Sequence, residues 1–116
     1  MPLIQAAKVS TYDFACPVAE AVMLRFRVRE ARGGLATFNF QNVGDADGTV
    51  TIQQSVDGTN WTDTTLADKV IKSGGYHSAD VMVKQGVVIQ LRVQASGGTR
   101  MQLQIRPNEI LDNLQI

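Results

Sequence analysis

The strongest concentration of charge in this sequence is a run of arginines at alternate positions. Arg25, Arg27 and Arg29 alternate with apolar residues, and Arg32 follows closely. Alternate residues of a β-strand share one face and lie roughly 6.6 to 7 Å apart. Guanidinium groups in such a row can bind the carboxylates of a protein partner bidentately, and they can also bind phosphate. The row therefore predicts either a contact with a partner or a solvated outer face.

The overall charge of the chain distinguishes a protein partner from a nucleic-acid partner. The chain has 11 basic and 11 acidic residues, so its net charge is zero. Nucleic-acid-binding surfaces usually combine a net positive charge with exposed aromatic residues. We therefore expect a protein partner rather than nucleic acid or an anionic membrane.

Residues of the types used in metal binding and catalysis are sparse. Asp45, Asp47 and Asp57 stand near glycines, but they lack the spacing and the terminal glutamate of a calcium-binding loop. Asp and Gly also form ordinary turns, which is the reading we favour. His77 and Cys16 are the only histidine and cysteine, and no nucleophile motif accompanies them. The sequence therefore predicts no enzymatic activity, no metal and no cofactor.

Trp61, the only tryptophan, has two possible roles. It could be a platform on which a sugar stacks, or it could anchor the hydrophobic core. A sugar platform would usually have a second aromatic residue beside it, and the sequence does not place Tyr12 or Tyr76 there. Because burial of the large indole ring is strongly stabilising, we predict that Trp61 lies in the core.

Large aliphatic residues gather near both ends of the chain. They are Leu3 and Ile4 at one end, and Ile110, Leu111, Leu114 and Ile116 at the other. A short segment with several such side chains is seldom left in water. Each segment can fold back over its own domain or dock on a neighbouring subunit. Together with the four arginines, these residues are our candidate partner contacts.

The elements that must position these residues are β-strands separated by glycine-rich turns. Alternating apolar residues predict strands at 22–29, 36–40, 48–56, 76–83, 87–94 and 101–106. No segment has a sustained helical period. Short strands with turn signals about every 8 to 12 residues are typical of sandwiches and barrels. The predicted fold is all-β, a single antiparallel β-sandwich or a Greek-key or jelly-roll-like barrel of about seven to eight short strands with extended termini.

The segment 48–63 gives the clearest turn signal. Val50, Ile52 and Val56 alternate with polar residues and lead into Asp57-Gly58. Asp-Gly favours a tight type I′ hairpin turn, because both residues tolerate positive φ. This pattern predicts a hairpin whose second strand carries Trp61.

The size of the chain sets its domain organisation. A chain of 116 residues with 44% hydrophobic residues can form one core but not two. We divide it into an N-terminal arm (1–19), a β-sandwich domain (20–106) and a C-terminal tail (107–116). One cysteine excludes an intrachain disulfide, and neither a signal peptide nor a membrane-spanning run is recognisable, so we expect a non-secreted protein.

The residues GTVTIQ at 48–53 and SVDGTNWTD at 55–63 carry a resemblance. A Gly-Thr-leading strand, a Ser-x-Asp-Gly turn and a Trp-bearing strand resemble small β-sandwich proteins of tailed-phage virions, including head decoration (cement) proteins and tail or fibre modules. A related signature occurs in discoidin-like and fibronectin-type-III-like domains, some of which bind carbohydrate. The motif contains no catalytic residues.

The resemblance implies a non-enzymatic virion structural protein, assembled in the host cytoplasm. The specific expectation is a capsid decoration protein that stabilises the phage head by bridging major capsid subunits. Its implied partners are the major capsid protein and copies of itself, with a trimer as one arrangement. The alternatives are a phage tail, neck or fibre module and a carbohydrate-binding β-sandwich module.

Overall fold

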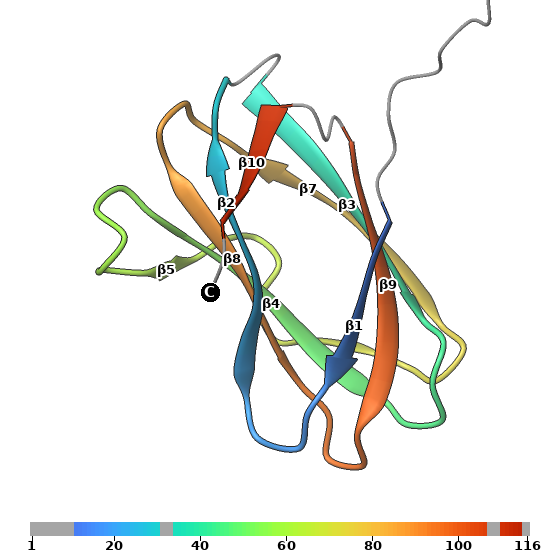
Figure 1. The fold of residues 1–116 in the computed structure, drawn as a ribbon. Coiled ribbons are helices and arrows are strands. Elements are labelled where there is room, and N and C mark those ends of the chain that lie inside the picture. Colours follow the sequence, from blue (N-terminus) through green and yellow to red (C-terminus); the bar gives the residue numbers. More distant parts are fainter. Residues whose placement is uncertain (1–10, 31–33, 107–109, 115–116) are drawn as a thin grey trace, which may run out of the picture.

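The computed structural model describes residues 11–30, 34–106 and 110–114, and strands and turns account for nearly all of them (Figure 1). The strands are β1 (Thr11–Cys16), β2 (Ala21–Val28), β3 (Leu35–Asn42), β4 (Gly48–Ser55), β5 (Thr62–Asp63), β6 (Lys69–Ile71), β7 (Tyr76–Met82), β8 (Val88–Gln94), β9 (Thr99–Arg106) and β10 (Leu111–Leu114). Within the described ranges, no helix is long and apolar enough to cross a bilayer.

The strands form two antiparallel sheets that pack face to face. The four-stranded sheet has the order β1-β9-β3-β7, and the six-stranded sheet has the order β10-β2-β8-β4-β5, with β6 also paired to β4. This arrangement confirms the predicted all-β sandwich. The ten strands of the described residues exceed the expected number because β6 and β10 have only three and four residues, too few to show an alternating pattern.

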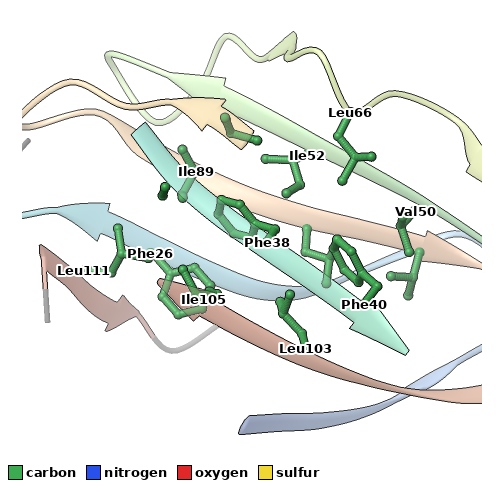
Figure 2. Packing of buried hydrophobic residues seen from close by; sticks show 14 of the residues in the cluster. Phe26, Phe38, Phe40, Val50, Ile52, Leu66, Ile89, Leu103, Ile105 and Leu111 are labelled. Carbon is green, nitrogen blue, oxygen red and sulfur yellow. The ribbon is translucent and has the colours of Figure 1, made fainter. Parts of the chain in front are cut away.

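The core lies between the sheets and is built from alternate residues of their strands. Phe38 and Phe40 on β3 face Val50 and Ile52 on β4, and Figure 2 shows these side chains meeting between the layers. The remaining predicted inward positions that are buried include Phe26, Val28, Ala36, Val81, Ile89, Leu91, Val93, Met101, Leu103 and Ile105. Period-two alternation therefore located most of the core correctly.

The loop after β4 differs from the predicted tight hairpin. Val56 was expected to face inward, but its side chain is 85% exposed. Of the two turn residues only Gly58 has a positive φ, 77°, so the backbone is not a type I′ turn. The carboxylate of Asp57 instead accepts hydrogen bonds from the backbone N–H groups of Asn60 and Thr59, both at 2.8 Å. These bonds close a longer loop and hold the pKa of Asp57 well below its usual range.

Parts of both predicted terminal segments are strands of the sandwich. Residues 11–16 of the predicted arm form β1, which pairs with β9, and residues 111–114 of the predicted tail form β10, which pairs with β2. Ile110 is 0% exposed, and Leu111 is also buried. These two candidate partner contacts are thus covered by their own chain. The pairing of β10 with β2 also covers an edge of the six-stranded sheet that would otherwise be open.

A buried asparagine ties together the turns at the end of the sandwich where β3 finishes. The side-chain amide of Asn42 donates to the carbonyl oxygens of Ala46 at 2.8 Å and Ile71 at 2.9 Å. Its side-chain oxygen accepts from the Gly44 N–H at 3.1 Å and the Thr99 hydroxyl at 2.9 Å. The Asn42 side chain therefore meets its full hydrogen-bonding capacity inside the protein.

Candidate functional site

The predicted row of arginines is divided in two by the structure. Arg25 is partly buried on the outer face of the six-stranded sheet, whereas Arg27 is exposed. Arg29 follows the end of β2, and its guanidinium lies 3.9 Å from the carboxylate of Asp112. Among the arginines of this row that the structure describes, Arg27 and Arg29 have largely exposed side chains.

The other candidate contacts are also distributed unevenly. Leu114 is half-buried and lies opposite Arg25 in the β10–β2 register. Leu3, Ile4, Arg32 and Ile116 lie outside the described residues. The structure thus does not gather the ten candidates into a single described surface.

Arg25 instead begins a ladder of side-chain hydrogen bonds that crosses the six-stranded sheet. Arg25 Nη2 donates to Gln90 Oε1, Gln90 Nε2 donates to Gln53 Oε1, and Gln53 Nε2 donates to Asp63 Oδ1, each at 2.9 Å. These residues lie directly opposite one another in the registers of β2, β8, β4 and β5. Gln90 is only 3% exposed, so the middle of this polar ladder is shielded from water.

Trp61 covers one end of the polar ladder rather than the core. The Arg25 guanidinium lies 5.3 Å from the centroid of the indole ring, within cation–π range. Trp61 is half-buried and does not belong to the core cluster, so the prediction of a core anchor is wrong. The longer loop after β4 places the ring on the outer face, where it contacts a cation instead of packing among aliphatic side chains.

Removing Arg25 should therefore have a different effect from removing its neighbour Arg27. We expect Arg25→Ala to lower the free energy of unfolding by about 1 to 3 kcal/mol, because it leaves Gln90 without its donor and Trp61 without its cation. The exposed control Arg27→Ala should stay within about 0.5 kcal/mol of wild type. Urea unfolding measures both values, and acrylamide quenching should show a more accessible Trp61 in Arg25→Ala alone. Equal losses in the two variants would contradict the polar ladder.

The acidic residues act as turn formers. Asp47 accepts hydrogen bonds from the Ser73 N–H at 3.0 Å and from Lys72 Nζ at 3.2 Å, and these partners lower its pKa. Across residues 11–30, 34–106 and 110–114, no group of three His, Cys, Asp or Glu side chains could hold a metal ion.

The single thiol and the single imidazole are held apart by the sheet. Cys16 lies on β1 and His77 on β7, the two opposite edges of the four-stranded sheet. Three inter-strand steps of about 4.8 Å separate these edges by about 14 Å, too far for a nucleophile–base pair. Burial also raises the pKa of the Cys16 thiol to about 11, which disfavours the reactive thiolate.

An apolar groove of about 450 Å³ opens at one end of the sandwich. It is lined by Gln54, Ser55, Val56, Asn60, Thr62, Met82, Lys84 and Val87. Val56 and Met82, which are 85% and 74% exposed, are the most exposed large hydrophobic residues of the described chain. Alternation along 48–56 did not indicate the groove, because it predicted an inward position for Val56. The available signal was Met82, an apolar residue at an outward position of its strand.

The exposed arginines lie at the same end of the molecule as the groove. Arg27 is opposite Val88 in the β2–β8 register, next to the groove residue Val87. Leu35, also exposed, is opposite Met82 in the β3–β7 register. In Figure 1 this end is the upper part of the sandwich, where β2 and β7 finish and β3 and β8 begin.

Comparison with known proteins supports the fold but not a family. No family model matches the chain, and no curated protein does so either. Among solved structures it is similar to the mitogen derived from Yersinia pseudotuberculosis, with a TM-score of 0.54, 13% identity and coverage of 92% of this chain and 96% of that one. It is also similar to PirA, with a TM-score of 0.59, 12% identity and coverage of 89% and 97%. At such low identity the likeness extends to the β-sandwich fold alone.

Proposed function

We propose that this protein is a non-enzymatic structural protein of a phage virion, most specifically a capsid decoration protein that bridges major capsid subunits. The resemblance of residues 48–63 to small virion sandwiches supports the virion setting. The two similar solved structures are a mitogen and PirA, so they add no support for this setting. The observation that carries the proposal is the apolar groove.

The groove has the chemistry of a protein-binding hot spot. Val56 and Met82 expose large apolar surfaces, while Gln54, Asn60 and Lys84 supply polar groups around them. Interfaces commonly seat an aliphatic or aromatic anchor in such a hollow and surround it with a polar rim. Contiguous exposed apolar surface is also costly in a monomer unless a partner covers it. We therefore assign the capsid contact to this groove.

The nearby arginines would orient the capsid partner on the groove. Arg27 lies on β2 opposite Val88, and Arg29 directly follows Val28, whose N–H donates to the carbonyl oxygen of the groove residue Val87. Both guanidinium groups can bind carboxylates on the capsid surface and so steer the approach of the partner. Binding of several copies would stabilise the assembled shell by mass action, because the decoration protein binds the assembled state.

Changing the groove should weaken capsid binding without unfolding the protein. We expect Met82→Glu to weaken binding to capsids that lack the protein by about 30-fold or more, the effect of losing a hot-spot residue of about 2 kcal/mol. Val18→Glu is the matched control, since Val18 is a similarly exposed aliphatic residue, 62% exposed, in the β1–β2 connection. Co-sedimentation with purified capsids measures the binding.

The heat resistance of the capsids provides the second readout. Added wild-type protein should raise the temperature at which decorated capsids open, and Met82→Glu should not. Failure of the wild-type protein to bind such capsids, with no change in their heat resistance, would refute the decoration proposal. Mass-spectrometric detection of the protein in purified tails instead of heads would favour the tail, neck or fibre alternative.

A further inference from the structure

The outer face of the four-stranded sheet carries a grid of uncharged polar side chains. Tyr76, Gln41 and Gln102 lie side by side in one row of the β7–β3–β9 register. The adjacent row contains Ser78, Asn39 and Gln104. We call these six residues the amide face. Neighbouring positions are about 4.8 Å apart across the strands and about 7 Å apart along them.

The amide face is hollowed at its centre. Asn39, Gln41, Tyr76, Gln102 and Gln104 line a cleft of about 80 Å³. Tyr76 is 66% exposed, so its ring stands at the rim with much of its surface accessible. The hollow cannot enclose a drug-sized molecule, but it can receive part of a ring that rests against Tyr76.

Part of this cleft is fixed by internal hydrogen bonds, and part is open. Asn39 Oδ1 accepts from the Tyr76 hydroxyl at 2.9 Å and from the Ser78 hydroxyl at 2.7 Å, which orients all three side chains. By contrast, the amides of Gln41 and Gln102 make no hydrogen bond with any described part of the chain. The cleft therefore combines a preorganised rim with free donors and acceptors.

The charges around the cleft limit the ligands that it could take. Among the described residues, the only ionisable side chain that lines it is the phenol of Tyr76. In the next row Asp80 already accepts a hydrogen bond from Thr37 at 2.6 Å. Asp13, opposite Gln102 on β1, is the nearest acidic group by register. The exposed Arg100 and Arg106 are the next outward residues on β9 beyond Gln102 and Gln104, about 7 Å along the strand, but neither lines the cleft. An apolar ligand would leave the amides unsatisfied.

We propose that the amide face binds a neutral saccharide, with one sugar ring against Tyr76 and its hydroxyl groups on Gln41 and Gln102. A sugar hydroxyl both donates and accepts hydrogen bonds, as a carboxamide does with its two ends. The exposed phenol ring offers an apolar surface with a polar tip. A peptide fits less well, because peptides bind sheets by backbone pairing at an edge, whereas this cleft lies on a face.

This saccharide site is independent of the proposed capsid contact. Tyr76 and Met82 lie at opposite ends of β7, about 20 Å apart over six residues. Variants of the two sites can therefore be tested separately, and failure of one proposal leaves the other standing.

The first test is a screen of the full-length protein against neutral oligosaccharides. The probes are hexasaccharides of glucose with β-1,4 or α-1,4 linkages, and of mannose and N-acetylglucosamine with β-1,4 linkages. Binding of each probe is followed by NMR titration into the millimolar range. We expect at least one probe to bind and to shift the side-chain NH₂ signals of Gln41 and Gln102. The absence of binding by every neutral probe, or binding of charged glycans or peptides alone, would overturn the proposal.

The second test uses variants of the amide face. Tyr76→Ala and Gln102→Ala should each weaken saccharide binding at least tenfold, while Tyr76→Phe should lose less because it retains the ring. Gln85→Ala, an exposed glutamine in the β7–β8 turn, and Met82→Glu should leave saccharide affinity unchanged. Thermal unfolding shows whether each variant is folded. Undiminished binding by a folded Tyr76→Ala/Gln102→Ala double variant would refute the site.

Discussion

Replacing Asn42 with alanine is expected to lower the free energy of unfolding by about 3 to 5 kcal/mol. Asn42 is fully buried and makes four hydrogen bonds. Alanine would leave the carbonyl oxygens of Ala46 and Ile71, the Gly44 N–H and the Thr99 hydroxyl without these partners. Because buried polar groups have no water to replace the lost partner, each contributes a desolvation penalty.

The neighbouring residue supplies the control for Asn42. Gln41 stands on the same strand but faces outward, so Gln41→Ala should change stability by no more than about 0.5 kcal/mol. Urea unfolding of both variants measures the difference. A further variant, Asn42→Asp, should also be destabilised at neutral pH, because a carboxylate would face two carbonyl oxygens that need a donor. A loss in Asn42→Ala no larger than in Gln41→Ala would show that the turns do not depend on this residue.

Replacing Ile110 with alanine is expected to cost about 2 to 5 kcal/mol of stability, as for other large buried aliphatic residues. Ile110 is fully buried just before β10, and its carbonyl oxygen accepts a hydrogen bond from the Arg29 N–H at 2.8 Å. The cavity left by the missing methyl and methylene groups would lie beneath the strand that covers the β2 edge. We expect β10 to detach more readily and the whole sandwich to become less stable.

The control for Ile110 is Asn113→Ala, because Asn113 is exposed on β10 itself. Asn113→Ala should unfold at nearly the wild-type urea concentration. The comparison also decides between the two readings of the C-terminal segment. An Ile110→Ala variant with wild-type stability but weakened self-association or capsid binding would restore Ile110 as a partner contact.

The burial and pairing of the candidate residues reduce the number that could contact a capsid partner. Of the candidates from the sequence, Ile110 and Leu111 are covered by the chain itself, and Arg25 is engaged by Gln90. Arg27 and Arg29 remain exposed beside the apolar groove. The proposed contact therefore moves from the termini to the end of the sandwich where Val56 and Met82 lie.

Alternation along single strands was enough to predict the fold class and most of the core. Alternation along β3 and β9 identified Phe38, Phe40, Leu103 and Ile105 as inward residues, and all are buried. This succeeds because side-chain direction in a strand has a period of two residues, which is a local property of the chain. The Asp57-Gly58 signal correctly marked a turn but not its type, since the Asp57 carboxylate accepts hydrogen bonds from the backbone N–H groups of Thr59 and Asn60, which close a longer loop.

Which outward-facing residues act together depends on how distant strands pair in the folded protein. The Arg25–Gln90 contact joins residues 65 positions apart, and the Tyr76–Asn39 contact joins residues 37 apart. Such pairs depend on strand order and register, which alternation within one strand does not encode. For the same reason, alternation within single strands did not predict the position of Trp61, the apolar groove or the amide face. The period of each strand specifies its two faces, and the pairing of distant strands specifies what those faces can bind.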